Sequence, residues 1–325
     1  MIGYYIHHAG RGHLHQALAT APLISDDVTA LSTLPRDERW RGDWLPLPRD
    51  DAADAPVDPQ ARGRLHWAPI HDDGLQQRMA RIAQWIMTCR PRAIVVDVSV
   101  EVLTLARLMG VPAITVCLPG VREDSPHALG WELAEAIIAP WPREFGFLTP
   151  QLDAYGDRTH FVGAISRFDA RKVESSPRTG RSALLLQGLG GARVNDRNPA
   201  ASADGWRWTV LGRNHWCDDP WPPLCAADVV VTHAGLGALA DVAAARKPAV
   251  VIADDRPFDE QRCTAAALRA AGIAVVADAD AQWPDLLDEA LRIGGTGWVR
   301  WSFGDGAARA AHVIDEVAHR FARGA

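Results

Sequence analysis

A histidine near the start of the chain, His13, stands in a glycine-containing turn between an apolar run and a helical pattern. The segment YYIHHAGRGHLHQALA, residues 4–19, starts as a strand, turns where two glycines flank an arginine, and continues as a helix. A helix N-terminus disfavours an imidazolium ring, so a histidine at this point is kept neutral and can act as a general base. Alternatively, His13 is a polar cap of the helix or part of the solvated surface. His8 and His15, which border the same turn, are the other candidate bases.

Asp97 is the expected partner of this histidine. It follows a four-residue apolar run in PRAIVVDVSVEV, residues 91–102, so we expect it at the carboxyl end of a strand, on the same sheet edge as the glycine turn. A carboxylate that accepts one imidazole N–H fixes the tautomer and leaves the other nitrogen able to take a proton. The alternative is that Asp97 caps the helix that follows.

A second glycine turn lies within DVVVTHAGLGALADVAAARKPAVVIADDRPFDEQ, residues 228–261. A strand is expected to end at His233, and the glycines at 235 and 237 allow close approach to the backbone where a helix begins. Free N–H groups at a helix N-terminus bind anions such as a pyrophosphate, and His233 would add a hydrogen bond. Asp241 lies two turns further along the helix, where it would accept a hydrogen bond from a sugar hydroxyl. The alternative is an ordinary glycine turn of an α/β domain.

The elements that must position these residues are visible as short apolar runs that alternate with helix-periodic stretches. This is the pattern of parallel sheets with helices on both faces. Strands are expected in IGYYI, AIVVD, PAITVCL, AIIAP, THFVG, SALLLQG, WRWTVLG, DVVVTH and PAVVIAD. Helices are expected in LQQRMARIAQWIMTCR, VEVLTLARLMG, GALADVAAARK and the C-terminal GAARAAHVIDEVAHRFARGA. The sequence therefore predicts an α/β protein.

A change of composition divides the chain in two. Residues 166–181 are polar and charged and contain a proline and a glycine, as in an interdomain linker. The strand, glycine turn and helix pattern restarts after it. We therefore expect one Rossmann-like domain over residues 1–165 and a second over residues 182–325, which ends in a terminal helix. Ligands gather at the carboxyl ends of strands in such sheets, so two facing domains would hold a ligand in the cleft between them.

Composition excludes several classes of protein. The 325 residues carry a net charge of −6, which argues against binding to nucleic acid through phosphate neutralisation. No apolar stretch reaches the roughly 18 residues that cross a bilayer, and the first residues do not form a secretion signal. The five cysteines include no CxxC pair, so we expect reduced thiols, a cytoplasmic location and no zinc site. The first turn also lacks the GxGxxG dinucleotide fingerprint, because His15 occupies its third glycine position.

The whole pattern resembles that of inverting glycosyltransferases with the GT-B fold, such as plant and antibiotic UDP-glycosyltransferases and the peptidoglycan lipid-II N-acetylglucosaminyltransferase. THAGLGALADVAAARKPAVVIADDRPFDEQ follows their donor motif in order, and NHWCDDPWPPLCAADVVVTH adds the preceding part. GRGHLHQALA is similar to their GxGHxxPxLxLA turn, and VVDVSVEVLTLARLMGVPAITV to the strand whose aspartate partners the catalytic histidine. THFVGAISRFD is similar to the end of their first domain. The resemblance covers nearly the whole chain and implies an N-terminal acceptor domain and a C-terminal donor domain.

The resemblance implies transfer of a sugar, with inversion, from a nucleoside diphosphate to an acceptor hydroxyl or amine. The donor would be UDP- or dTDP-linked, and neither a metal nor another cofactor is expected. His13 would be the base and Asp97 would orient it. Trp216 would stack on the nucleobase and Asp241 would hold the ribose, while Glu260 and Gln261 would bind sugar hydroxyls. The donor-binding residues expected in this way are Gly12, Gly190, Gly191, Trp216, His233, Gly235, Leu236, Gly237, Ala238, Asp241, Glu260 and Gln261.

Two positions depart from the donor motif. Ala238 stands where the family has a serine or threonine, and Asp241 stands where it has a glutamate, which is one methylene longer. A hydrogen bond to a charged group contributes roughly 1.5–3 kcal/mol, so these changes would weaken donor binding without preventing it. The identity of the donor is therefore less determined than the fold.

Other functions share this architecture. A nucleotide-sugar hydrolase or a 2-epimerase is the first alternative, and a sugar-nucleotide-binding protein without catalysis is the second. The acceptor would be a small molecule or a lipid-linked one, and the latter would bring the protein into peripheral contact with the inner face of the membrane. In the segment of residues 119–132, Glu123 and His127 either contact the acceptor or have no role in binding it.

Overall fold

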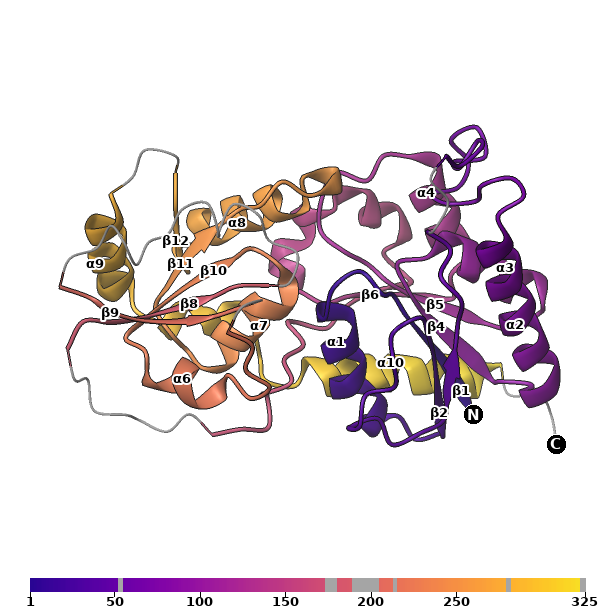
Figure 1. Ribbon diagram of the computed structural model, residues 1–325, viewed down its shortest axis with the longest axis horizontal. Coiled ribbons are helices and arrows are strands. Elements are labelled where there is room, and N and C mark those ends of the chain that lie inside the picture. The colour runs from indigo at the N-terminus through magenta and orange to yellow at the C-terminus, as the bar shows by residue number, and fades with distance from the viewer. Residues whose placement is uncertain (52–54, 173–179, 189–204, 213–214, 279–281, 322–325) are drawn as a thin grey trace.

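Two parallel β-sheets form the framework of the protein. The computed structural model describes residues 1–51, 55–172, 180–188, 205–212, 215–278 and 282–321. Figure 1 shows the two sheets side by side, one built from the N-terminal half of the chain and the other from the C-terminal half. The α/β class and the two-sheet arrangement that the sequence predicts are confirmed.

The first sheet contains β1 (Ile2–Ile6), β2 (Val28–Ser32), β3 (Trp44–Pro46), β4 (Ala93–Asp97), β5 (Ala113–Val116), β6 (Ala136–Ala139) and β7 (Thr159–Phe161). Their order is β3-β2-β1-β4-β5-β6-β7, and all neighbours are parallel. The strand order therefore changes direction between β1 and β4. In α/β sheets such a switch leaves a crevice at the carboxyl ends of the two strands, where ligands bind. The first glycine turn and Asp97 both lie at this crevice.

The second sheet contains β8 (Ser182–Leu186), β9 (Arg207–Leu211), β10 (Val229–His233), β11 (Ala249–Ile252) and β12 (Val275–Val276). Its order is β12-β11-β10-β8-β9, again with parallel neighbours. Here the order changes direction between β8 and β10. The second glycine turn leaves the carboxyl end of β10 at that point.

Helices cover both faces of each sheet. On the first sheet, α2 (Asp73–Cys89), α3 (Val100–Leu108) and α4 (Ser125–Leu133) pack on one face, and α1 (Gly12–Thr20) packs on the other. On the second sheet, α6 (Trp221–Ala226), α7 (Leu236–Ala244) and α8 (Glu260–Ala270) pack on one face, opposite α9 (Trp283–Ile293). Among the described residues, the short 3-10 helices are η1 (Ala21–Leu23), η2 (Arg143–Leu148), η3 (Pro150–Tyr155), η5 (Pro257–Asp259) and η6 (Thr296–Arg300).

The terminal helix α10 (Gly306–Arg320) does not belong with the C-terminal sheet, where the sequence analysis put it. It packs with α1 on the open face of the first sheet and contacts β4 and β6 (Figure 1). Its apolar stripe, which includes Ile314 and Val317, joins the core formed by Ile2 and Tyr4. The reason is that one helix is too small to cover this face of a seven-stranded sheet. The limits of the two domains otherwise remain a prediction.

All nine apolar runs expected to be strands contain strands, but three strands were missed. β3 and β12 have only three and two residues, and β2 reads VTALS, a run broken by hydroxyl side chains. The buried hydroxyl of Ser32 is accommodated because it is hydrogen-bonded: Ser32 Oγ–H donates to the carbonyl of Ile6 at 2.8 Å.

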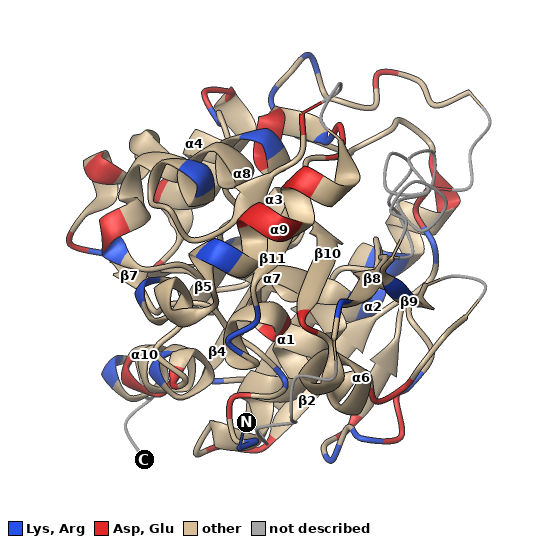
Figure 2. Cartoon of the chain, turned by 90° about the vertical axis from the view of Figure 1, so that its left-hand side faces the viewer, with Lys and Arg blue, Asp and Glu red and all other residues tan. Residues whose placement is uncertain are grey.

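In Figure 2, basic and acidic residues are interspersed along the helices and loops of the face in view. No helix in the described part of the chain combines the length and the apolar character needed to cross a membrane.

Candidate active site

His13 and Asp97 meet at the switch point of the first sheet. His13 is the second residue of α1, and Asp97 is the last residue of β4, the strand beside β1. His13 Nδ1–H donates to Asp97 Oδ2 at 2.7 Å, with the carboxylate buried. This bond fixes the tautomer, so the pair of electrons on Nε2 is available to accept a proton. The contact expected between these residues is present, and their catalytic role remains a prediction.

The pKa of His13 is raised above its ordinary value of 6.5. Burial acts in the opposite direction, but the charge of Asp97, its hydrogen bond to the ring and the charge of Glu260 together outweigh burial. The helix N-terminus was expected to keep the ring neutral, so the buried carboxylate reverses the expected direction. His13 is therefore a stronger base than a free imidazole, and it is neutral and able to take a proton when the pH lies above its pKa.

The two other candidate bases are turned to different partners. His15 Nε2 lies 3.2 Å from Arg167 Nη1 and accepts its N–H, and burial together with nearby arginines lowers the pKa of His15 to about 3. His8 Nε2 lies 3.3 Å from a carboxylate oxygen of Asp51, on the loop after β3. Of the three histidines, His13 is thus the one that combines a carboxylate-oriented ring with the cleft.

His233 lies at the end of β10 in a matching position on the second sheet. Its Nδ1 accepts the N–H of Gly235 at 3.0 Å, so the ring proton resides on Nε2. Burial lowers the pKa of His233, which keeps the ring neutral. A Cβ on Gly188 would lie 2.7 Å from Nε2, so a side chain there would displace the ring of His233. Gly188, the first glycine of QGLGG, was not among the residues expected at the donor site. Gly190 and Gly191, which were expected there, lie outside the described residues.

The N-termini of α1 and α7 approach each other across the cleft. A Cβ on Gly237 would lie 3.6 Å from the Cα of Gly12, so the two glycine turns are in contact. Gly235 precedes α7 without a side-chain cap, and Leu236 and Ala238 lie in its first turn. The first backbone N–H groups of a helix have no partner within the helix, and a helix N-terminus beside a cleft can therefore bind an anion. The cavity enclosed at this contact measures only about 20 Å³, room for a single water, so a nucleotide requires the domains to move apart here.

Asp241 is already bonded within the protein. Its Oδ1 accepts from Ser166 Oγ at 2.8 Å, and its Oδ2 accepts from Arg167 Nε at 3.1 Å. Burial raises the pKa of Asp241, and the charge of Arg167 acts against that rise. Both oxygens are thus held by the segment that connects the two sheets. Binding of a ribose by Asp241, as expected from the sequence, would require Arg167 or Ser166 to give way.

Gln261 and Glu260 differ in spite of being neighbours at the start of α8. Gln261 is buried, and its Oε1 accepts the backbone N–H groups of Ala234 at 3.1 Å and Asp254 at 3.0 Å. Its side chain therefore ties together the segments that leave β10 and β11. Glu260 instead faces the cleft and contributes to the field at His13. Of the two, Glu260 is the one whose carboxylate is placed to meet a ligand.

Trp216 is exposed at the mouth of the cleft, and the other domain already contacts it. Its indole N–H donates to Asp218 Oδ1 at 2.8 Å, and the guanidinium of Arg11 lies 5.5 Å from its ring centre. Such a contact at an exposed ring contributes about 0.5–1 kcal/mol. A nucleobase that stacks on Trp216 can displace it at small cost.

The side chains of His66, Asp124 and His127 form a cluster whose ligand atoms lie within 4.8 Å of one another. Arg122 Nη1–H donates to His127 Nε2 at 2.7 Å, so the proton of this ring is on Nδ1, which donates to Asp124 at 2.8 Å. A metal at Nδ1 would displace that proton beside a fixed guanidinium. The donor set is therefore a poor match for a cation. Both ring nitrogens of His127 thus have partners in its own domain, Arg122 and Asp124, and Glu123 is exposed beside Gln151.

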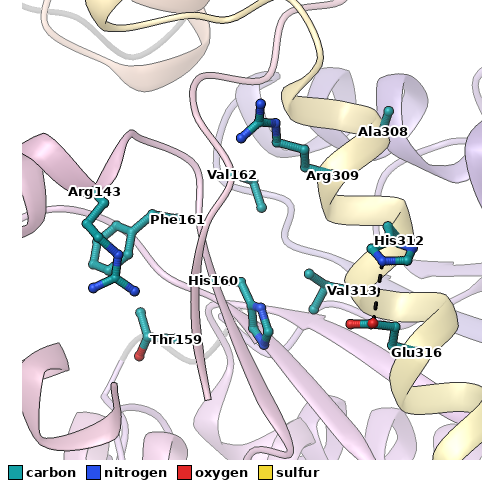
Figure 3. A pocket seen from close by; sticks show the side chains of 10 residues that line it. All are labelled: Arg143, Thr159, His160, Phe161, Val162, Ala308, Arg309, His312, Val313 and Glu316. Carbon is teal, nitrogen blue, oxygen red and sulfur yellow. Dashed lines mark ion pairs between the residues drawn. The ribbon is translucent and has the colours of Figure 1, made fainter. Parts of the chain in front are cut away.

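A groove of about 530 Å³ lies elsewhere, between β7 and α10. Figure 3 shows His160 and Val313 facing each other across it, with His312 and Glu316 paired on the helix side. None of its lining residues belongs to the groups around His13 or His233. This groove is larger than the enclosed cavity between the glycine turns, but it lacks their chemistry.

Comparison with known proteins gives three kinds of finding. Residues 222–293 match the glycosyltransferase family 28 C-terminal domain. No curated protein sequence matches the chain. Among solved structures, the glycotransferase of kitacinnamycin aligns at 18% identity and a TM-score of 0.66, covering 97% of this chain and 98% of that one.

Two further structures align over similar lengths. MurG of Acinetobacter baumannii is 15% identical, with a TM-score of 0.61 and coverage of 97% and 99%. The Streptomyces sp. SF2575 glycosyltransferase SsfS6, solved with thymidine diphosphate, is 13% identical, with a TM-score of 0.62 and the same coverage. At these identities the likeness concerns the fold.

Proposed function

We propose that this chain, a GT-B protein with a glycosyltransferase family 28 C-terminal domain, transfers a sugar from a nucleoside diphosphate to an acceptor hydroxyl or amine with inversion. The observation that carries the proposal is the bond between His13 and buried Asp97, directly across the cleft from the N-terminus of α7. A base and an anion site are the two groups that such a transfer needs on opposite sides of the anomeric carbon. UDP- or dTDP-linked sugars are the proposed donors, in line with the thymidine diphosphate bound to SsfS6.

In the proposed reaction His13 Nε2 takes the proton of the acceptor as its oxygen or nitrogen attacks the anomeric carbon. The bond from that carbon to the β-phosphate oxygen breaks, and the electron pair leaves with the diphosphate. Asp97 stabilises the imidazolium that forms. The N-terminal N–H groups of α7 and the Nε2–H of His233 stabilise the departing charge, so no metal ion is invoked.

The domains must open for a donor to enter, because the two glycine turns are in contact. The segments held together there come from different sheets, which is the arrangement in which closure over a ligand completes a site. We propose that the nucleotide takes the space between α1 and α7 and that Trp216 exchanges Arg11 for the nucleobase.

A thermal-shift panel with UDP, dTDP, GDP and ADP tests the donor site. A ligand at about 100 times its Kd adds about 2.7 kcal/mol to the free energy of unfolding, which is readily measured. We expect one nucleotide to stabilise the protein and His233→Ala to abolish the effect. If no nucleotide stabilises the protein, the transferase proposal is contradicted. Release of free sugar at the same rate with and without acceptors would instead favour a hydrolase.

A further inference from the structure

Two consecutive residues before α8 adopt the left-handed backbone conformation, which residues other than glycine rarely adopt. Phe258 has φ 61° and ψ 21°, and Asp259 has φ 53° and ψ 24°. A left-handed conformation is unfavourable for a bulky residue, and it persists where surrounding contacts impose it. Glu260 follows at once as the first residue of α8. The strained turn therefore sets the direction in which this carboxylate enters the cleft.

The contacts that hold the turn come from the other domain. The N–H of Val121 donates to the carbonyl of Phe258 at 2.9 Å. A Cβ on Gly120 would lie 2.4 Å from the same carbonyl oxygen, so only glycine allows this approach. The ring of His127 meets the ring of Phe258 edge to face, with centres 4.7 Å apart.

Arg122 lies at the centre of these contacts and is buried. Its guanidinium donates to the carbonyl of Leu118 at 2.8 Å and to that of Pro119 at 3.0 Å, in addition to its bond to His127. It also lies 4.8 Å from the centre of the Phe258 ring. Three hydrogen bonds and one aromatic ring therefore restrict the rotation of the Arg122 guanidinium. Its Nη2 is then placed 4.0 Å from Glu260 Oε2.

We propose that Arg122, locked against Phe258 across the cleft, is a positioning residue for Glu260 and so makes recognition of the donor's sugar depend on contact between the domains. This inference rests on the proposed function. Arg122 belongs to the acceptor-side segment of residues 119–132, which the family resemblance leaves without a role on the donor side. The consequence is that an acceptor which disturbs this segment also alters the binding of the sugar.

The charges around Glu260 agree with this role. Burial raises the pKa of Glu260, and the groups that act against this rise are Arg122, then His13 on α1, then Arg256 in the preceding loop. The thiol of Cys117, which directly follows β5, also interacts with the charges of Arg122 and Glu260. Burial raises the pKa of this thiol to about 12, so it stays neutral. Loss of Arg122 removes the largest of the charges that lower the pKa of Glu260.

The first test measures the contribution of the sugar to binding. Calorimetry gives the Kd of UDP and UDP-glucose, and of dTDP and dTDP-glucose, for the wild type and for Arg122→Gln. We expect unchanged affinity for the free diphosphate and about tenfold loss of the extra affinity that the glucose provides. Glu260→Gln should show the same loss, and the double variant no further loss. Arg122→Lys should recover part of the effect, and Arg107→Gln, an exposed arginine of the same domain, should have none.

Equal loss of affinity for the free diphosphate, or losses that add in the double variant, would overturn the proposal. A second measurement needs no ligand: carboxyl ¹³C NMR of glutamate-labelled protein, with Glu260 assigned from the Glu260→Gln spectrum. The pKa of Glu260 should rise in Arg122→Gln, and an unchanged pKa would refute the role of Arg122. If the wild type binds no nucleotide, the proposed function fails, while the titration still decides on Arg122.

Discussion

The two sides of the cleft use their polar side chains in opposite ways. On the N-terminal side, His13 and Asp97 bond to each other, and Nε2 of the histidine is left for a substrate. On the C-terminal side, Gln261 and Asp241 are bonded to their own backbone or to the connecting segment. The proposed base is thus in place before any ligand arrives, whereas the donor site needs local movement. Residues can therefore follow a binding motif in sequence while their side chains are used to hold the fold together.

The largest expected effect is loss of the base. His13→Ala should lower turnover by about 10²–10⁴-fold, because a positioned general base contributes that much to the rate. The Kd of the nucleoside diphosphate should change less than twofold, since the diphosphate meets α7 and His233. His15→Asn is the matched control, and it should retain most of the activity. A parallel loss of nucleotide affinity in His13→Ala would place this histidine on the donor side instead.

The pH dependence sharpens the same contrast. Because the pKa of His13 is raised above 6.5, the midpoint of the acid limb of kcat/KM should lie above pH 6.5. Below that midpoint, kcat/KM should fall about tenfold for each pH unit. In Asp97→Asn the limb should move to lower pH. The raised pKa also stabilises the fold below about pH 6.5, and this contribution is lost as the pH rises through the folded-state value. An acid limb unaffected by Asp97→Asn would contradict the pairing as its cause.

Substitution of Asp241 tests whether the polar side chains on the C-terminal side of the cleft stabilise the fold rather than bind a ligand. Asp241→Asn should lower the free energy of unfolding by about 3 kcal/mol, because Arg167 is left half-buried without its carboxylate. Chemical denaturation gives this value. The exposed pair of Arg181 and Asp288 is the control, and Asp288→Asn should cost less than about 1 kcal/mol. Reduced nucleotide affinity with unchanged stability would favour the ribose contact expected from the sequence.

Substitution of Gln261 should also lower the free energy of unfolding, but by less than substitution of Asp241. Gln261→Met fills a similar volume but removes the oxygen that accepts the N–H groups of Ala234 and Asp254. We expect a loss of about 2 kcal/mol in the free energy of unfolding. Gln261→Glu, which retains an acceptor oxygen, should keep more of the stability. Unchanged stability in the methionine variant would show that these backbone groups find other partners.

The smallest effect should come from restoring the hydroxyl of the family motif. Ala238→Ser adds a donor in the first turn of α7, and we expect up to about tenfold tighter binding of the nucleoside diphosphate by calorimetry. Ala240→Ser, on the same helix but buried, should give no such gain. Unchanged affinity in Ala238→Ser would mean that the diphosphate does not contact this turn.

Much of the fold and part of the site follow from local pattern. The nine apolar runs became strands because a β-strand buried on both faces needs little more than a short apolar run. The meeting of His13 with Asp97 was predictable because parallel neighbouring strands bring their carboxyl ends to one edge. The location of α10 was not, because an amphipathic helix carries no information about which sheet it covers.

By itself, then, the sequence determined the strands, the two glycine turns and the order of the donor motif, since each depends on residues that are neighbours along the chain. The tertiary structure alone decided that Arg167 holds Asp241 and that Arg122 reaches Glu260. These contacts join residues 74 and 138 positions apart and lie between the two sheets. Only the packing of one domain on the other brings such side chains within reach, and no local pattern encodes that distance.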